Sequence, residues 1–258
     1  MKWPEYIVLV RHLASIYNTL KARKLADPLY REFLEAFNED WEGPKAKYLA
    51  ERIGFKFSLR MSDADTPLEK SLAEQGKIVG QELKKLINIP DVIFVSPYLR
   101  TRETLTRMIG GWPELSQVET IYDERIREQS HGLVTIYNDW KLFAVLHPDQ
   151  KILRDQEGPY WYQFPQGEST PEVRDRNRLW IQMVIREFAG KKVLVITHHL
   201  NILAILANLL RWDTREFIRR DEEEKPVNGG VTILRGNPDL GKDGRMILRP
   251  EEYNMKLY

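Results

Sequence analysis

The sequence predicts an α/β fold, a three-layer α/β/α sandwich around a mostly parallel central sheet. Short runs of apolar, β-branched residues recur along the chain, as at 5–10, 91–95 and 193–197. Segments with helical periodicity lie between these runs, and strands that alternate with helices are typical of parallel sheets. The runs have the length and composition of buried strands rather than of surface loops. The fold class follows from this alternation.

Composition narrows the classes of function. The chain has 258 residues, enough for one domain with a sizeable core. Its 39 Lys and Arg residues nearly balance 38 Asp and Glu, so the overall charge gives no reason to expect a nucleic acid partner. It contains no cysteine, which excludes disulfides, thiol nucleophiles and thiolate metal sites and fits a reducing compartment.

The apolar runs also bear on location. The N-terminal run, residues 6–10, is short and continues directly into Arg11, unlike a signal peptide. The longest run, residues 200–210, is interrupted by Asn201 and Asn208 and is too short to cross a bilayer. We therefore expect a cytoplasmic protein without a membrane partner. No repeat or linker divides the sequence, so residues 1–258 are predicted to form a single domain.

The first predicted strand, residues 5–10, is followed by a long helical insertion at about 16–64. Asp27 and Pro28 have the residue types that cap and start a helix. An apolar residue then recurs every four positions, at Leu29, Phe33, Phe37 and Trp41. This stripe favours packing against the core over binding of a partner. We expect the insertion to lie over the sheet edge or the mouth of the site.

The remaining elements alternate in the same way. They are a helix over about 69–87, a strand at 91–95, a strand at 118–122, a helix at 170–189, a strand at 193–197 and a helix to about 210. Strands at 231–235 and 246–249 predict a C-terminal hairpin. Residues 133–168 show no clear pattern, although their aromatic cluster at 160–164 is more typical of a core than of a substrate-binding wall.

Basic side chains follow three of the predicted strands. Arg11 and His12 come directly after the first strand, Arg100 lies just past the strand at 91–95, and His198 follows the strand at 193–197. Because the carboxyl ends of parallel strands meet at one edge, these groups are expected to converge there. Guanidinium groups pair well with phosphate oxygens. The arrangement predicts a pocket for a dianionic phosphoryl group attacked by an imidazole nitrogen.

Motifs at these strand ends carry a resemblance to a known family. Arg11, His12, Ser15 and Asn18 match Arg-His-Gly-x-Ser-x-x-Asn, with Leu13 in place of Gly. Ser96, Pro97 and Arg100 match Ser-Pro-x-x-Arg, and Thr197 and His198 match Thr-His-Gly, with His199 in place of Gly. Between them lie Glu128 four residues before Gly132 and the Gly-Glu-Ser at 167–169, and Asn228 begins a late Asn-x-x-Val-Thr. The chain from 7 to about 235 therefore resembles the histidine phosphatase superfamily, also called phosphoglycerate-mutase-like, and most of all its plant, fungal and bacterial mutase-like branch.

The resemblance implies a role for each matched residue. His12 would be the nucleophile, with its second ring nitrogen bonded to a backbone carbonyl. Arg11, Arg100 and His198 would bind the phosphoryl oxygens, and Glu128 would act as the acid and base. Glu124, one turn from Glu128, is the alternative to it.

Further residues are expected to contact the substrate: Ser15, Asn18, His131 and His199, with His131 equally compatible with a solvent-facing position. No metal and no cofactor is implied, and the expected partner is a small phosphorylated substrate. A metal hydrolase built on His12, His198 and His199 is a weaker alternative, because no Asp joins the strand ends. A homo-oligomer is left open.

The leading functional hypothesis is a metal-independent phosphatase that hydrolyses a phosphomonoester through a phosphohistidine. A bisphosphoglycerate-dependent mutase is an alternative, which the absence of an adjacent Arg-Arg pair between 133 and 168 disfavours. A catalytically weak or dead phospho-ligand binding protein is another. It is raised by Leu13 and His199, because glycine at these places lets backbone approach phosphate or take conformations closed to other residues.

Overall fold

The computed structural model describes residues 3–236 and 245–258. The chain divides into two compact units, which are described separately. The first comprises Met1–Ser15, Ala64–Glu128 and Glu172–Tyr258, and the second Ile16–Asp63 and Gln129–Pro171. Among the described residues, we find no helix with the length and apolar character needed to cross a membrane. The insertion predicted at 16–64 thus forms one unit with residues 129–171, which include the range 133–168 that the sequence left unassigned.

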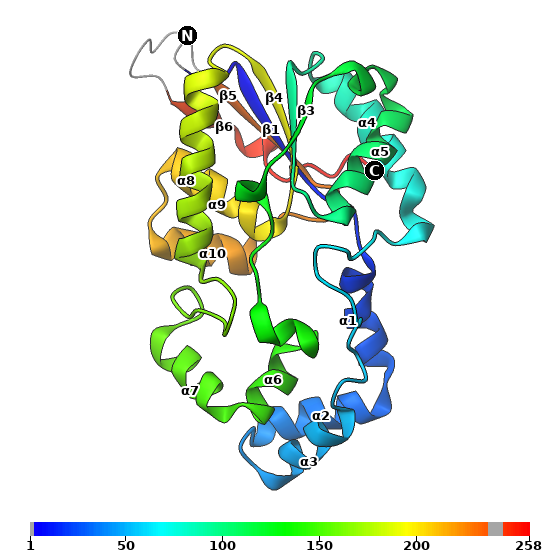
Figure 1. Cartoon of the computed structure of the whole chain (residues 1–258), viewed down its shortest axis with the longest axis vertical. Coiled ribbons are helices and arrows are strands. Elements are labelled where there is room, and N and C mark those ends of the chain that lie inside the picture. Colours follow the sequence, from blue (N-terminus) through cyan, green and yellow to red (C-terminus); the bar gives the residue numbers. More distant parts are fainter. Residues whose placement is uncertain (1–2, 237–244) are drawn as a thin grey trace. The chain divides into compact units, whose positions relative to one another are not determined.

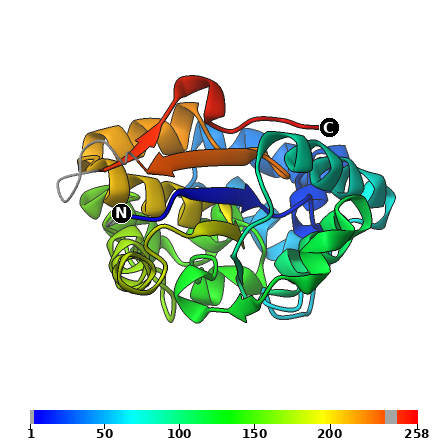
Figure 2. The ribbon, with the colours of Figure 1, turned by 90° about the horizontal axis from the view of Figure 1, so that it is seen from above.

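The first unit is built on a six-stranded sheet with the order β3-β2-β4-β1-β5-β6. The strands are β1 (Tyr6–Arg11), β2 (Val92–Val95), β3 (Thr120–Tyr122), β4 (Lys192–Thr197), β5 (Val231–Gly236) and β6 (Met246–Leu248). The first four strands of the order, β3, β2, β4 and β1, are parallel to one another. β5 runs antiparallel to β1, and β6 runs antiparallel to β5. Figure 2 shows blue β1 beside orange β5. The mostly parallel sheet is confirmed. β5 and β6 pair antiparallel, and the connection of the predicted hairpin, at 237–244, lies outside the described residues.

Helices cover both faces of this sheet (Figure 1). On one face, Val8, Val10 and Ile196 pack against α4 (Ala73–Leu86) and α5 (Leu99–Gly111). On the other face, Leu9, Phe94 and Val195 pack against α8 (Thr170–Glu187) and α9 (His199–Leu210). Successive strand residues point to opposite faces, so strands buried on both sides are apolar throughout. The three-layer α/β/α sandwich is therefore confirmed.

Shorter elements complete the first unit. α10 (Thr214–Glu223) follows α9, and 3₁₀ turns span Lys70–Leu72, Pro113–Gln117, Glu124–Ile126 and Pro250–Glu252. The helix predicted at 69–87 thus begins with a 3₁₀ turn and continues as α4.

The second unit is helical. It contains α1 (Ile16–Ala26), α2 (Pro28–Glu39), α3 (Pro44–Ile53), a 3₁₀ turn at Gly132–Ile136, α6 (Trp140–Leu146) and α7 (Pro148–Glu157). Asp27 caps α2 by accepting a hydrogen bond from the Tyr30 amide, as predicted. Phe33 is fully buried in the core cluster of this unit, which also contains Leu49 and Leu142.

The apolar stripe predicted through Trp41 was wrong at its last position. α2 ends at Glu39, and Asp40 has an extended backbone, so Trp41 lies beyond the helix. The repeat of apolar residues does not show where α2 ends, because the backbone conformation at Asp40 ends the helix and the apolar pattern continues past it.

The register of the sheet decides where the strand ends lie. Arg11 is opposite Thr197, and Val95 is opposite Ile196. The residues that follow these pairs, His12, Ser96 and His198, therefore leave the sheet at the same edge.

Candidate active site

His12 is buried at this edge, with 3% of its surface exposed. Its Nδ1 lies 2.6 Å from the carbonyl oxygen of Leu13. A carbonyl can only accept, so Nδ1 carries the proton and Nε2 keeps its lone pair. Burial, and after it the positive charges of Arg100 and Arg11, hold the pKa of His12 well below its ordinary value. The neutral ring thus keeps an unprotonated Nε2, and the expected contact of the other ring nitrogen with a backbone carbonyl is present.

Leu13 occupies the place of the family's glycine without strain. Its backbone does not have a positive φ, and its side chain is 1% exposed. Its two methyl groups pack against Gly76 and Gly229, which have no side chain. A Cβ added to Gly76 would stand 2.7 Å from Leu13 Cδ1, and one added to Gly229 would stand 3.0 Å from Leu13 Cδ2. The leucine therefore turns into the core of the first unit while its carbonyl orients His12.

His198 lies edge to face with His12, their ring centroids 5.1 Å apart. Its Nε2 is 2.7 Å from the Ser96 hydroxyl, and its Nδ1 is buried without a hydrogen-bond partner in the described part of the chain. With the hydroxyl as donor, the ring proton sits on Nδ1, which can then donate a hydrogen bond to an oxygen bound in the pocket. Burial and then the charge of Arg100 place the pKa of His198 well below its ordinary value.

Arg100 is buried in the first turn of α5, and its guanidinium lies over the ring of Tyr98 at 4.8 Å. The same ring meets His198 edge to face at 5.1 Å. Thr104, one turn further along α5, accepts a hydrogen bond from the Leu13 amide at 3.1 Å. α5 therefore carries Arg100 and also holds, through Thr104, the segment that contains His12. Sequence reasoning missed Tyr98, although an aromatic residue two positions before an Arg at a strand end is a usable signal.

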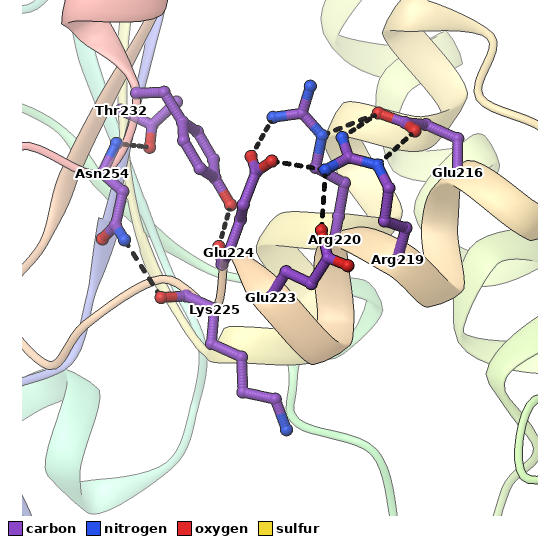
Figure 3. Close-up of polar contacts among 9 residues, drawn as sticks. Glu216, Arg219, Arg220, Glu223, Glu224, Lys225, Thr232 and Asn254 are labelled. Carbon is purple, nitrogen blue, oxygen red and sulfur yellow. Dashed lines mark hydrogen bonds and ion pairs between the residues drawn. The ribbon is translucent and has the colours of Figure 1, made fainter.

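The loop after α10 supports Arg11 and His12. Arg11 Nη1 donates to the Pro226 carbonyl at 2.6 Å, and Asn228 Nδ2 donates to the His12 carbonyl at 3.1 Å. Arg11 Nε is buried without a hydrogen-bond partner among the described residues, and burial lowers the pKa of this guanidinium. The loop is itself held by Asn254, which bonds the Lys225 carbonyl and the Thr232 hydroxyl (Figure 3).

His199 is the first residue of α9 and faces α10. Its Nε2 lies 2.7 Å from Asp221 Oδ1, and the expected substrate contact of His199 stays a prediction. Next to Asp221, Arg219 and Arg220 form ion pairs with Glu216 and Glu224 (Figure 3). The described residues contain no group of three or more His, Asp or Glu side chains suited to a metal ion.

Glu128 lies within electrostatic reach of Arg11, because its negative charge raises the pKa of that guanidinium against the larger effect of burial. Glu124 is different: its side chain is 75% exposed and lies 3.8 Å from Arg127. Ser15 is buried and its backbone bridges to Leu68 in the first unit.

Two of the predicted substrate contacts belong to the second unit. Asn18 is on α1, and His131 stacks on Phe164 with ring centroids 4.9 Å apart. The first unit thus brings together Arg11, His12, Arg100 and His198, whereas Asn18 and His131 stay predictions.

A family model agrees with this geometry. The model described as histidine phosphatase superfamily (branch 1) matches residues 58–241, more than half of the chain. The chain belongs to the histidine phosphatase superfamily. The matched range begins after His12, beyond the first half of the insertion, and it includes Arg100, Glu128 and His198.

Relatives of this superfamily member carry mutase-like and phosphatase names. This chain is 24% identical over 177 residues to phosphoglycerate mutase-like protein AT74H of Arabidopsis thaliana. The match covers 61% of this chain and 60% of the relative. This chain is 28% identical over 157 residues to phosphoserine phosphatase 1 of Hydrogenobacter thermophilus, covering 59% of this chain and 69% of the relative. The chain therefore spans only about three fifths of the length of the first relative.

Solved structures show the same fold. A mycobacterial glucosyl-3-phosphoglycerate phosphatase in complex with inorganic phosphate has a TM-score of 0.65 and 18% identity, over 98% of both chains. The α-ribazole phosphatase of Shigella flexneri has a TM-score of 0.66 and 13% identity, over 97% of this chain and 96% of that one. At these sequence identities, the structural likeness establishes only the fold of this histidine phosphatase superfamily member.

Proposed function

We propose that this protein hydrolyses a phosphomonoester through a phosphohistidine on Nε2 of His12, without a metal ion. The observation that carries the proposal is the state of His12: a buried ring whose Nδ1 donates to Leu13 and whose pKa is held low beside two guanidiniums. A neutral imidazole with a fixed tautomer is a ready nucleophile. The phosphatases among its relatives and structural neighbours support a hydrolase.

The proposed reaction has two steps. Nε2 forms a bond to phosphorus as the ester P–O bond breaks, and Glu128 gives its proton to the leaving oxygen. Water then attacks the phosphohistidine, Glu128 takes the proton of that water, and the P–N bond breaks to release inorganic phosphate. Arg11, Arg100 and His198 stabilise the charge on the three non-bridging oxygens in both steps.

The proposal is tested with p-nitrophenyl phosphate in the presence of EDTA. Wild type is expected to turn over and to form an acid-labile phosphoenzyme, whereas His12→Ala should lose about 10³-fold or more in kcat and form none. His147→Ala, a histidine of the second unit packed on Phe143, is the matched control. A wild type without turnover and without phosphoenzyme would overturn the proposal in favour of a binding protein. Transfer between 2- and 3-phosphoglycerate, faster than hydrolysis, would make the protein a mutase instead.

A further inference from the structure

The segment that ends in Glu128 is held by side chains at each of four successive carbonyl groups. Arg176 Nη1 donates to the carbonyl of Arg125 at 2.8 Å, and its Nη2 donates to that of Glu128 at 3.1 Å. Between them, Thr197 Oγ1 donates to Ile126 at 2.7 Å and Asn201 Nδ2 to Arg127 at 2.7 Å. The three donors come from α8, the end of β4 and α9.

This segment has little regular structure of its own. It leaves the short strand β3 through one 3₁₀ turn, Glu124–Ile126, and then continues with an extended backbone at Arg127. A backbone of this kind is fixed by whatever satisfies its carbonyl groups. Here the satisfying groups are side chains anchored on the sheet and its helices, so the segment is tied to the rigid part of the first unit.

Arg176 differs from the other two donors because it spans the segment. A guanidinium is planar and presents its N–H donors in a fixed fork, so two carbonyls bonded to one fork are held at a fixed separation. Those two carbonyls belong to Arg125 and Glu128, the two ends of the segment. The last of them belongs to the residue whose carboxyl group must reach the leaving oxygen.

The same arginine lies near the phosphoryl pocket. The pKa of His198 is lowered mainly by burial and then by the charges of neighbouring groups. The charge of Arg176 is one of these, with a smaller effect than that of Arg100. The carboxylate of Glu128 acts in turn on Arg11. Arg176 is thus close enough to His198 to act on its pKa, while its Nη1 and Nη2 donate to backbone oxygens of the segment that ends in Glu128.

We propose that Arg176 is a positioning residue that sets the place of Glu128 for proton transfer to the leaving group. This rests on the proposed function, since it takes Glu128 as the general acid. The role depends on the fork of the guanidinium and not on its charge alone. Asn201 and Thr197 act with it by fixing the two carbonyls between its own.

The choice of leaving group separates positioning of an acid from a structural role. p-Nitrophenolate departs without a proton, whereas the alkoxide of an alkyl phosphate such as glycerol phosphate needs one. We expect Arg176→Met to lose about 10- to 100-fold in kcat with glycerol phosphate and less than about threefold with p-nitrophenyl phosphate. KM should change little for either substrate, because Arg176 touches no phosphoryl oxygen in the proposal.

Two further variants make the result specific. Arg176→Lys keeps the charge but loses the fork, so it should resemble Arg176→Met; wild-type behaviour would mean that charge alone matters and would overturn the proposal. Arg178→Met is the matched control, because Arg178 is on the same helix with 59% of its side chain exposed and pairs with Asp175. It should match wild type with both substrates, and thermal denaturation reports whether each variant folds.

The outcomes also separate this inference from the function beneath it. Equal losses with both substrates, or no loss in Arg176→Met, overturn the positioning role while leaving the phosphohistidine reaction in place. Glu128→Gln should show the same dependence on leaving group, more strongly. If Glu128→Gln loses no more with glycerol phosphate than with p-nitrophenyl phosphate, Glu128 is not the acid, and the proposed function fails at that step.

Discussion

The rings of His12 and His198 meet edge to face at 5.1 Å, and both side chains are almost fully shielded from water. Burial disfavours an imidazolium, and two so close would also repel. Arg100 adds to this at both rings, and the pKa of each lies well below its ordinary value. The folded protein therefore keeps both histidines neutral in the range where an unfolded chain begins to protonate them.

The first prediction concerns stability at acidic pH. In the unfolded chain His12 and His198 bind protons below about pH 6.5, whereas in the folded protein they do so only at lower pH. The unfolded state then binds more protons, so the free energy of unfolding must fall as the pH drops below about 6.5 and until the folded-state pKa is reached. Urea unfolding of wild type and His198→Asn between about pH 7 and 5 measures this change in the free energy of unfolding. The variant should lose less stability than wild type over this range, and an equal or larger loss would contradict the prediction.

A second prediction concerns Leu13. Restoring the family's glycine by Leu13→Gly should not raise turnover of p-nitrophenyl phosphate, because the side chain fills space beside Gly76 and Gly229. We expect the free energy of unfolding to fall by about 3–5 kcal/mol, as for a large buried side chain removed from a core. Gly76→Ala should also destabilise, since its Cβ would stand 2.6 Å from Arg107 Cβ and 2.7 Å from Leu13 Cδ1. Urea unfolding checks both. A Leu13→Gly variant as stable as wild type and faster with p-nitrophenyl phosphate would show that the leucine blocks the site.

Much of the fold and part of the site could be predicted from sequence. Strands such as β1 and β4 are buried on both faces, so their apolar runs are unbroken and end visibly at His12 and His198. Strand ends in turn locate the edge where those histidines meet. Local pattern, read together with the motif order, was enough for this part.

The rest depends on contacts that leave little trace in sequence. The association of residues 129–171 with the insertion rests on packing such as Leu142 against Phe33, more than 100 positions apart. Arg176 binds the carbonyls of a distant segment, and carbonyls are the same for every residue type. One signal was available: Arg176 stands three residues after Val173 and four before Trp180, both fully buried, so it lies toward the inner face of its helix.

The ion pair between His199 and Asp221 gives a third prediction. It links the start of α9 to α10, and the two side chains are 19% and 33% exposed. A double-mutant cycle with His199→Asn and Asp221→Asn should show a coupling of about 0.5–1.5 kcal/mol in the free energy of unfolding. The pair Arg186 and Glu187, both well exposed, is the matched control and should show less than about 0.5 kcal/mol. A zero coupling for His199 and Asp221 would mean that the contact adds nothing to the packing of the two helices.

A buried polar group in the second unit gives the fourth prediction. Asp139 caps α6, lies 2.8 Å from Lys24 Nζ and accepts a hydrogen bond from Tyr30 at 2.5 Å. Lys24 and Asp139 have side chains only 10% and 6% exposed. Asp139→Ala leaves the ammonium of Lys24 buried without its counter-charge, so we expect a loss of about 3–5 kcal/mol.

Urea unfolding, with hydrogen exchange at α1 and α6 as a local readout, measures that loss. The control is Lys45→Met, which removes an exposed pair with Glu32 and should cost less than about 0.5 kcal/mol. If both variants cost the same, the ion pair of Asp139 does not hold these helices together.

The acceptor that sets the tautomer of His12 is a main-chain oxygen, that of Leu13. A scan that replaces one side chain at a time cannot delete this oxygen, so a map of mutational sensitivity would not register the atom that fixes the tautomer of His12. The loss of function would appear instead at the side chains that position this carbonyl. Thr104 does so through the Leu13 amide, and Asn228 does so through the His12 carbonyl. In such a map, two polar residues far apart in the chain would stand out together, although each acts on His12 only through the backbone.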